Sequence, residues 1–282
     1  LESQFSDIGM AAGFLAMNIG KRSLGLDIKS EKGKEILFAL IKKSDVILHN
    51  FRAGVVDRLG LDYESVKAIN PSIVYTVISG FGAKGPRSAD PAYDGAIQAA
   101  AGMMANNGTA ESGPLRTGYM PVDLMTGMTA AYATTAALLR KQKTGEGQMV
   151  DVAMLDCAIT LGSANFARSE VDDVPDMLIG NQSITSVPTA SSFPTADGSI
   201  LTAAIMPNHV EAFFDEIGLK EMLNDPKFAT REARIENKEI VRDAMIEALQ
   251  ADTAENWEKR LAPRGVPVAK INSVSETSKL EQ

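Results

Sequence analysis

The stretch SLGLDIKSEKGKEILFALIKKSDVILH, residues Ser23–His49, changes its hydrophobic period twice. Ser23–Ile28 alternates apolar and polar residues, which predicts a short strand. Ser30–Lys43 predicts an amphipathic helix, because its apolar residues recur at helical spacing behind a serine that can cap it. Asp45–His49 predicts a buried strand. Strand, helix and strand in this order predict a β–α–β unit, from which parallel sheets are built.

The same pattern continues along the chain, where Ser72–Ser79 predicts the next strand after two short helices. Ligands of an open parallel sheet bind outside the carboxyl ends of its strands. Asn50, Phe51 and Arg52 follow one predicted strand, and a loop beginning at Gly80 follows the next. The sequence therefore predicts an α/β fold with a ligand site at this edge of the sheet.

The loop Gly80–Gly85 matches the dinucleotide fingerprint G-x-G-x-x-G. That fingerprint binds a pyrophosphate only where it opens a helix. Here Pro86 follows at once, and the residues up to Pro91 are typical of a loop. We therefore reject a dinucleotide site and interpret the glycines as a flexible cover over a ligand.

The character of the chain changes near residue 187, beyond which a second, smaller α+β domain is predicted. Ser191–Ile205 reads as a hairpin on an Asp-Gly turn, and helices follow over residues 208–217, 230–249 and 253–261. Val266–Ile271 predicts a last strand. We expect a large domain over residues 1–186 and a small domain over residues 187–282.

The stretch RTGYMPVDLMTGM, residues 116–128, places Asp123 before a long alanine-rich run without proline. Such a run predicts a helix, and a carboxylate at its start lies at the positive end of the helix dipole. Aspartate is also a common helix cap. The local sequence alone leaves capping and catalysis open as roles for Asp123.

The composition excludes several classes of function. The chain has 282 residues and a net charge of −8, which argues against a nucleic-acid surface. Its single cysteine excludes an intrachain disulfide and fits a reducing cytoplasm, and two histidines without a Cys/His cluster argue against zinc. We find no apolar run long enough for a membrane span and no signal-peptide pattern. The expectation is a cytoplasmic protein with no nucleic-acid or membrane partner.

Several motifs taken together resemble the class III CoA-transferases, a family that also includes the α-methylacyl-CoA racemases. The resemblance covers the chain from about Asn18 to its end. These motifs are KRSLGLDIK (21–29), DVILHNFRAGVVDRLG (45–60), SGFGAKGP (79–86), PAYD (91–94), the Asp123 stretch and KTGEGQMVDV (143–152).

The resemblance implies a large Rossmann-like domain and a smaller α+β domain in an interlocked homodimer. It implies that acyl-CoA and a small carboxylic acid are substrates, with no tightly bound cofactor and no metal. The catalytic residue would be Asp123. The family's first β–α–β segment would precede this sequence, and its return to the large domain would follow. The positions that match CoA contacts are Leu26, Lys29, Asn50, Phe51, Arg58, Ala92 and Tyr93.

The implied reaction moves CoA through an aspartyl anhydride and an aspartyl-CoA thioester. We expect backbone N–H groups at the start of the Asp123 helix to stabilise the oxyanions. A racemase is the first alternative, and it needs an acid/base pair across the α-carbon. Tyr93 stands where that subgroup has histidine, and tyrosine, with a pKa of about 10, is a poor base. An inactive CoA-binding subunit is the second alternative, and no residue indicates the donor or acceptor acid.

Overall fold

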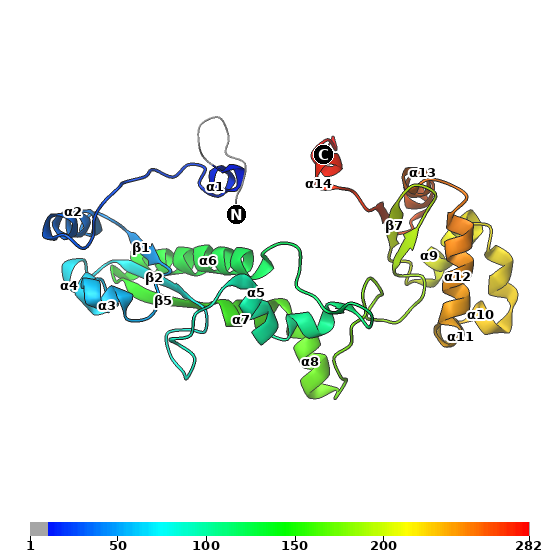
Figure 1. Cartoon of the computed structure of the whole chain (residues 1–282), viewed down its shortest axis with the longest axis horizontal. Helices are drawn as coiled ribbons and strands as arrows, with labels where there is room; N and C mark the ends of the chain where they lie inside the picture. Colours follow the sequence, from blue (N-terminus) through cyan, green and yellow to red (C-terminus); the bar gives the residue numbers. More distant parts are fainter. Residues whose placement is uncertain (1–10, 282) are drawn as a thin grey trace. The chain divides into compact units, whose positions relative to one another are not determined.

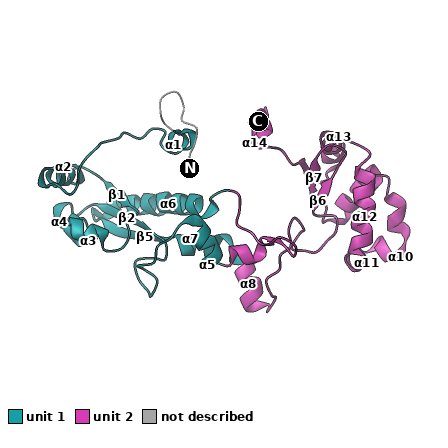
Figure 2. Ribbon diagram, viewed as in Figure 1, with its two compact units in different colours: residues 1–101, 119–163 teal, residues 102–118, 164–282 magenta. Residues whose placement is uncertain are grey.

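The computed structural model describes residues 11–281, whose elements are labelled in Figure 1. Internal contacts divide the chain into two compact units, coloured separately in Figure 2. Unit 1 contains the residues up to 101 together with 119–163, and unit 2 contains 102–118 and the residues from 164 on. These units divide the chain at a different point from the expected domains 1–186 and 187–282, which stay a prediction.

Unit 1 is built of three strands and seven helices within the described part of the chain. The strands are β1 (Val46–His49), β2 (Val74–Ser79) and β5 (Gln148–Ala153). The helices are α1 (Ala12–Met17), α2 (Glu31–Ile41), α3 (Val55–Leu59), α4 (Tyr63–Ile69), α5 (Asp94–Ala100), α6 (Pro121–Thr144) and α7 (Met154–Leu161).

The three strands form one parallel sheet in the order β1-β2-β5. Because side chains of a strand alternate between the two faces, the central strand β2 contributes to two cores. Tyr75 packs with residues of α2 and α4 on one face, whereas Val74 packs against Ala130 and Ala137 of α6 on the other. The result is a sheet between helical layers, and the α/β class with a parallel sheet is confirmed.

The expected strand Ser23–Ile28 is wrong. Residues 21–27 have no regular secondary structure and pair with none of the described strands. Alternation reports only on side chains, whereas a strand also needs a neighbour for its backbone hydrogen bonds. The β–α–β unit is instead formed by β1, the helices α3 and α4, and β2. The expected helix after Ser30 is confirmed, and the Ser30 hydroxyl accepts a hydrogen bond from the Gly33 N–H at 3.1 Å.

Unit 2 contains an antiparallel sheet in the order β6-β7-β8 and a two-stranded hairpin of β3 and β4. Its strands are β3 (Gly108–Thr109), β4 (Gly113–Pro114), β6 (Ser192–Pro194), β7 (Ser199–Thr202) and β8 (Val268–Lys270). Its helices are η1 (Met103–Asn106), α8 (Ser163–Val171), α9 (Pro207–Glu216), η2 (Lys220–Asn224), α10 (Pro226–Ala229), α11 (Arg231–Glu236), α12 (Lys238–Leu249), α13 (Ala254–Leu261), η3 (Ala262–Arg264) and α14 (Val274–Thr277).

The predicted hairpin of unit 2 is confirmed, with β6 and β7 joined across Asp197 and Gly198. The predicted helix over residues 230–249 is divided at Asn237 into α11 and α12. Phe193 of β6 and Trp257 of α13 lie in one core with side chains of α9 and α12. Among residues 11–281, no helix combines the length and the apolar character that crossing a bilayer requires.

Candidate active site

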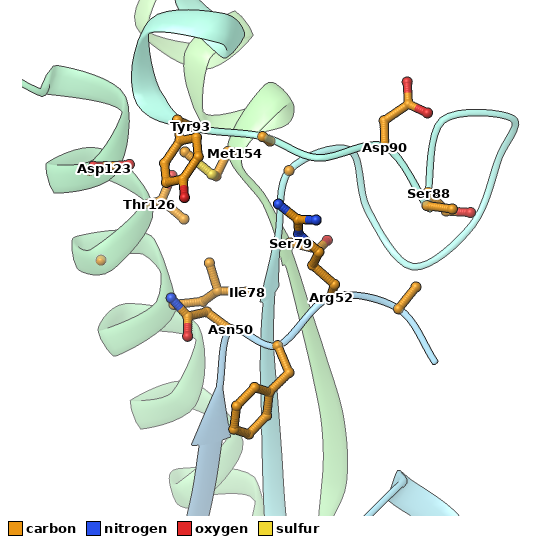
Figure 3. A pocket seen from close by; sticks show the side chains of 16 residues that line it. Asn50, Arg52, Ile78, Ser79, Ser88, Asp90, Tyr93, Asp123, Thr126 and Met154 are labelled. Carbon is orange, nitrogen blue, oxygen red and sulfur yellow. The ribbon is translucent and has the colours of Figure 1, made fainter. Parts of the chain in front are cut away.

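A cavity of about 510 Å³ opens in unit 1 where the strands β1 and β2 end. Asn50, Phe51 and Arg52 line it directly after β1, and Ser79 lines it at the end of β2. Asp123 enters its wall from the first turns of α6. Figure 3 shows these walls with their side chains. The cavity therefore occupies the edge of the sheet that the sequence predicts for a ligand.

Asp123 is the third residue of α6 and does not cap that helix. The cap position is Met120, whose side chain accepts no hydrogen bond, and Pro121 occupies the first helical position. Val122 and Thr126 are buried on the inner face of the helix, so Asp123 lies beside that face. Asp123 is exposed and lines the cavity. A carboxylate so placed can be reached by a ligand.

Asp94, the first residue of α5, supplies the missing cap of α6. Its Oδ2 accepts hydrogen bonds from the backbone N–H of Val122 at 2.9 Å and of Asp123 at 3.1 Å. Its Oδ1 accepts a third bond from Gln98 Nε2 at 2.5 Å, and Asp94 is only 7% exposed. A buried carboxylate needs such partners, because unpaired charge is costly away from water. Asp94 thereby fixes the start of the helix that carries Asp123.

The surroundings of Asp123 raise the pKa of its carboxyl group. Partial burial is the larger cause, since it disfavours the charged form. The nearby charge of Asp94 raises the pKa further. A less stabilised carboxylate is a stronger base than an ordinary aspartate, which suits a nucleophile.

The expected oxyanion donors at the start of α6 are occupied. Pro121 has no N–H group, and the N–H groups of Val122 and Asp123 both donate to Asp94. The next N–H group, of Leu124, donates to the Met120 carbonyl. This part of the expectation is wrong because the helix start is already capped by a side chain from another element.

The predicted CoA residues are divided between two cavities of unit 1. Asn50, Phe51, Ala92 and Tyr93 line the cavity of Asp123. Lys29 and Arg58 line a second cavity of about 410 Å³, which Lys34 also lines. Leu26 lines neither of these two cavities. The roles of all seven residues in binding CoA remain predictions.

The loop after β2 turns away from the cavity and then returns to it. Of the expected cover Gly80–Gly85, only Gly80 lines the cavity, whereas Ser88, Ala89 and Asp90 form part of its wall. The Arg87 guanidinium lies 3.8 Å from the centre of the Phe81 ring, and its Nε donates to Asp90 Oδ2 at 2.9 Å. These contacts within the loop connect its outgoing and returning arms.

One residue of this site, Asp94, was missed by the reasoning from sequence, which did place Arg52 at this edge of the sheet. Arg52 is the only lysine or arginine that lines the Asp123 cavity within the described residues. Asp94 caps a helix that begins 27 residues later in the chain. The sequence feature that could have indicated such a cap is the start of that helix. Met120-Pro121 offers no capping side chain, so the cap had to come from elsewhere in the chain. No group of three potential metal ligands is found among residues 11–281.

Comparison with known proteins identifies similar chains. A sequence model described as CoA-transferase family III matches residues 3–282. Acetyl-CoA:oxalate CoA-transferase of Acetobacter aceti is 33% identical over 95% of this chain and 69% of its own length. Succinate–glutarate CoA-transferase of Agrobacterium fabrum is 31% identical over 94% of this chain and 66% of its own. The chain spans 58% to 69% of the length of three such relatives.

A solved structure supports the same relationship. The crystal structure of a CAIB/BAIF family protein from Brucella suis superimposes with a TM-score of 0.88 at 31% sequence identity. The match covers 96% of this chain and 72% of that one. The described fold is thus the fold of a known group of proteins.

Proposed function

Because the chain belongs to CoA-transferase family III, we propose that the whole protein moves CoA from an acyl-CoA donor to a carboxylic acid acceptor, with Asp123 as the nucleophile. The observation that supports this role most directly is the position of the Asp123 carboxylate, exposed in a cavity at the ends of parallel strands. The transferase class is also that of the relatives from Acetobacter and Agrobacterium.

The first half of the reaction transfers the CoA moiety to the enzyme. The Asp123 carboxylate attacks the thioester carbonyl, the carbon–sulfur bond breaks, and CoA leaves as its thiolate. The thiolate then attacks the aspartyl carbonyl of the mixed anhydride. The donor acid leaves as a carboxylate, and Asp123 carries CoA as a thioester.

The second half repeats these two steps in reverse with the acceptor. The acceptor carboxylate attacks the aspartyl thioester and releases the thiolate, which then attacks the acceptor carbonyl. Asp123 leaves as a carboxylate and is regenerated. Only carboxylates and a thiolate act as nucleophiles and leaving groups, so no step needs a general base. This chemistry fits a site in which no histidine is among the lining residues.

Arg52 supports a short dicarboxylic acid as one of the substrates. It is a permanent positive charge that lines the same cavity as Asp123, and a guanidinium binds a carboxylate through paired hydrogen bonds. The names of the relatives include oxalate, succinate and glutarate. A screen of acetyl-CoA and succinyl-CoA against these acids tests the assignment.

The covalent intermediate provides the decisive experiment. The full-length protein is incubated with acyl-CoA and then with hydroxylamine, which converts an aspartyl thioester into a hydroxamate that peptide mass spectrometry locates. We expect the adduct at position 123 and its absence in Asp123→Asn. We also expect that variant to lose transfer by about 1,000-fold or more, since nucleophiles of covalent enzymes have effects of that order. Full transfer activity in Asp123→Asn would overturn the proposal.

Two alternatives give different results in the same preparation. A racemase exchanges the α-proton of its acyl-CoA with deuterium from solvent and forms no hydroxamate. An inactive CoA-binding subunit binds CoA but does neither. The homodimer stays a prediction, and the sedimentation of the full-length protein tests it.

A further inference from the structure

His49, the last residue of β1, contacts the backbone that enters the candidate CoA site. Its Nδ1 lies 3.3 Å from the backbone nitrogen of Phe51, which donates a hydrogen bond to it. The His49 and Phe51 rings are also stacked, with centroids 5.8 Å apart and planes inclined by 26°. Asn50 and Phe51 line the Asp123 cavity, and we call these two residues the coenzyme turn.

The other nitrogen of His49 contacts a buried tyrosine. Ile47 pairs with Tyr75 across the sheet, and His49 lies two residues further on the same face of β1. His49 Nε2 is therefore within reach of the Tyr75 hydroxyl, at 2.9 Å. Tyr75 is 1% exposed, so its hydroxyl has no water as an alternative partner on this side.

The tyrosine hydroxyl determines which nitrogen of His49 carries the proton. Tyr75 Oη donates to the Leu61 carbonyl at 2.6 Å, and a hydroxyl has only one proton to donate. It can therefore only accept from His49, which requires a proton on Nε2. Nδ1 is then unprotonated and accepts the Phe51 N–H. The neutral Nε2–H tautomer satisfies every partner in this chain of hydrogen bonds.

We propose that His49 is a positioning residue of the coenzyme turn: its Nε2–H tautomer, selected by Tyr75, holds the Phe51 backbone in the conformation that binds acyl-CoA. The inference rests on the proposed function, in which this turn binds CoA. An imidazolium would carry protons on both nitrogens. Its Nδ1–H would face the Phe51 N–H, donor against donor, so protonation releases the turn.

The groups around His49 favour the neutral form. Burial lowers the pKa of His49 and raises the pKa of Tyr75 to about 12, so both stay neutral near pH 7. The charges of Asp62 and Asp57 raise the pKa of Tyr75 further. The Tyr63 ring packs edge-on against Tyr75. Binding of CoA should therefore weaken only as the pH falls below the ordinary histidine value of about 6.5.

Two variants separate the two hydrogen bonds of His49. His49→Asn keeps an acceptor for an N–H group two residues later, as asparagine commonly does, but cannot titrate. His49→Gln carries its amide one bond further out, so that it keeps a donor for Tyr75 but has no acceptor at the position of Nδ1, which Phe51 uses. CoA affinity is measured by calorimetry for the full-length protein at about pH 7.5 and about pH 5, on either side of the ordinary histidine value of about 6.5.

We expect His49→Asn to bind CoA at the higher pH as the wild type does. At the lower pH the wild type should lose affinity by roughly 3- to 10-fold more than His49→Asn, the value of one hydrogen bond. His49→Gln should be weak at both values. The CoA phosphate also titrates, with a pKa of about 6, but it does so equally with each variant. Only the difference between the proteins reports on His49.

The tautomer is tested separately by nitrogen-15 NMR of the imidazole rings. The chain has two histidines, so His209 serves as an internal reference. We expect His49 as the Nε2–H tautomer, and a mixture with the Nδ1–H form in Tyr75→Phe. An Nδ1–H tautomer in the wild type, or an unchanged pH dependence in His49→Asn, would overturn this inference but leave the proposed function standing. Failure of the wild type to bind CoA at either pH would overturn the proposed function and this inference with it.

Discussion

Two carboxylates meet at the start of α6 in different surroundings. Asp94 is buried and accepts three hydrogen bonds, two of them from the backbone of that helix. Asp123 is open to the cavity, and burial and the charge of Asp94 raise its pKa. One carboxylate therefore positions the helix, and the other, in the proposed function, is the nucleophile; their different surroundings alone would produce this division of roles.

Replacing Asp94 by Asn should shift the pH dependence of transfer. The amide oxygen can still accept the two backbone N–H groups, so α6 keeps its cap. The negative charge beside Asp123 disappears, and the pKa of Asp123 falls toward its ordinary value. Asp123 is then ionised at lower pH. We expect the acid limb of the kcat/KM profile to move to lower pH in Asp94→Asn.

Asp90→Asn is the matched control for that experiment. It removes a carboxylate from the wall of the same cavity, but Asp90 is not among the causes of the shifted pKa of Asp123. Its acid limb should coincide with that of the wild type. If Asp94→Asn also coincides, the charge of Asp94 does not act on the nucleophile.

At the scale of elements, Arg87 makes two side-chain contacts within the loop between β2 and α5. Arg87 lies over the Phe81 ring and forms an ion pair with Asp90, which lines the cavity. An exposed ion pair contributes about 0.2–1 kcal/mol, and an exposed cation–π contact about 0.5–1 kcal/mol. Together they are sufficient to bias an exposed loop toward one conformation.

Arg87→Ala should therefore loosen this loop without touching the nucleophile. We expect KM for acyl-CoA to rise by roughly 3- to 10-fold, which corresponds to about 1 kcal/mol, with kcat nearly unchanged. Hydrogen exchange should become faster in residues 81–90. Arg140→Ala, which removes an exposed ion pair with Glu146 at the far end of α6, is the control and should alter neither quantity.

The approach of β5 to β2 depends on a glycine. A Cβ atom on Gly147 would lie 2.1 Å from the Ile73 carbonyl oxygen, so Gly147→Ala must displace the backbone of one strand. We expect a loss of about 1–3 kcal/mol in the free energy of unfolding, measured with urea. Gly127→Ala, where no atom lies within 4 Å, should instead gain about 0.5–1 kcal/mol because glycine weakens a helix. If Gly147→Ala and Gly127→Ala changed the free energy of unfolding equally, the close approach of Gly147 to Ile73 would be contradicted.

Local patterns predicted those elements whose stability is local. The Ser30 cap and the apolar period after it predicted α2, and the apolar runs before His49 and Ser79 predicted β1 and β2. Ser23–Ile28 carried an equally clear alternation and forms no strand, because pairing depends on a partner that the pattern does not contain. The same limit applies at the site: the stretch around Asp123 predicted a carboxylate near a helix start, whereas its partner Asp94 required knowing that two helices meet.

At the scale of the whole molecule, the chain has separate hydrophobic cores. Every buried residue of the core around Phe193 and Trp257 belongs to unit 2, whereas the two cores of the parallel sheet belong to unit 1. Cooperative unfolding follows shared packing. The two units should therefore respond separately to a ligand that binds only one of them.

The single tryptophan makes this separation measurable. Trp257 is 3% exposed in the core of unit 2, so its fluorescence reports on that unit alone. CoA at about 100 times its Kd should stabilise unit 1 by about 2.7 kcal/mol, which circular dichroism detects. The fluorescence midpoint should not move. Met245→Ala in the unit 2 core should do the reverse, lowering that midpoint while CoA affinity is kept. Coincident shifts of both probes would contradict independent units.

The bond between Asp94 and the α6 backbone has a consequence for biosynthesis. The two partners leave the ribosome at different times, and the Asp123 segment emerges after the residue that caps it. Until both have folded together, Asp123 lacks the burial and the neighbouring charge that raise its pKa. In the proposed function, the nucleophile is therefore completed only when the two segments have assembled.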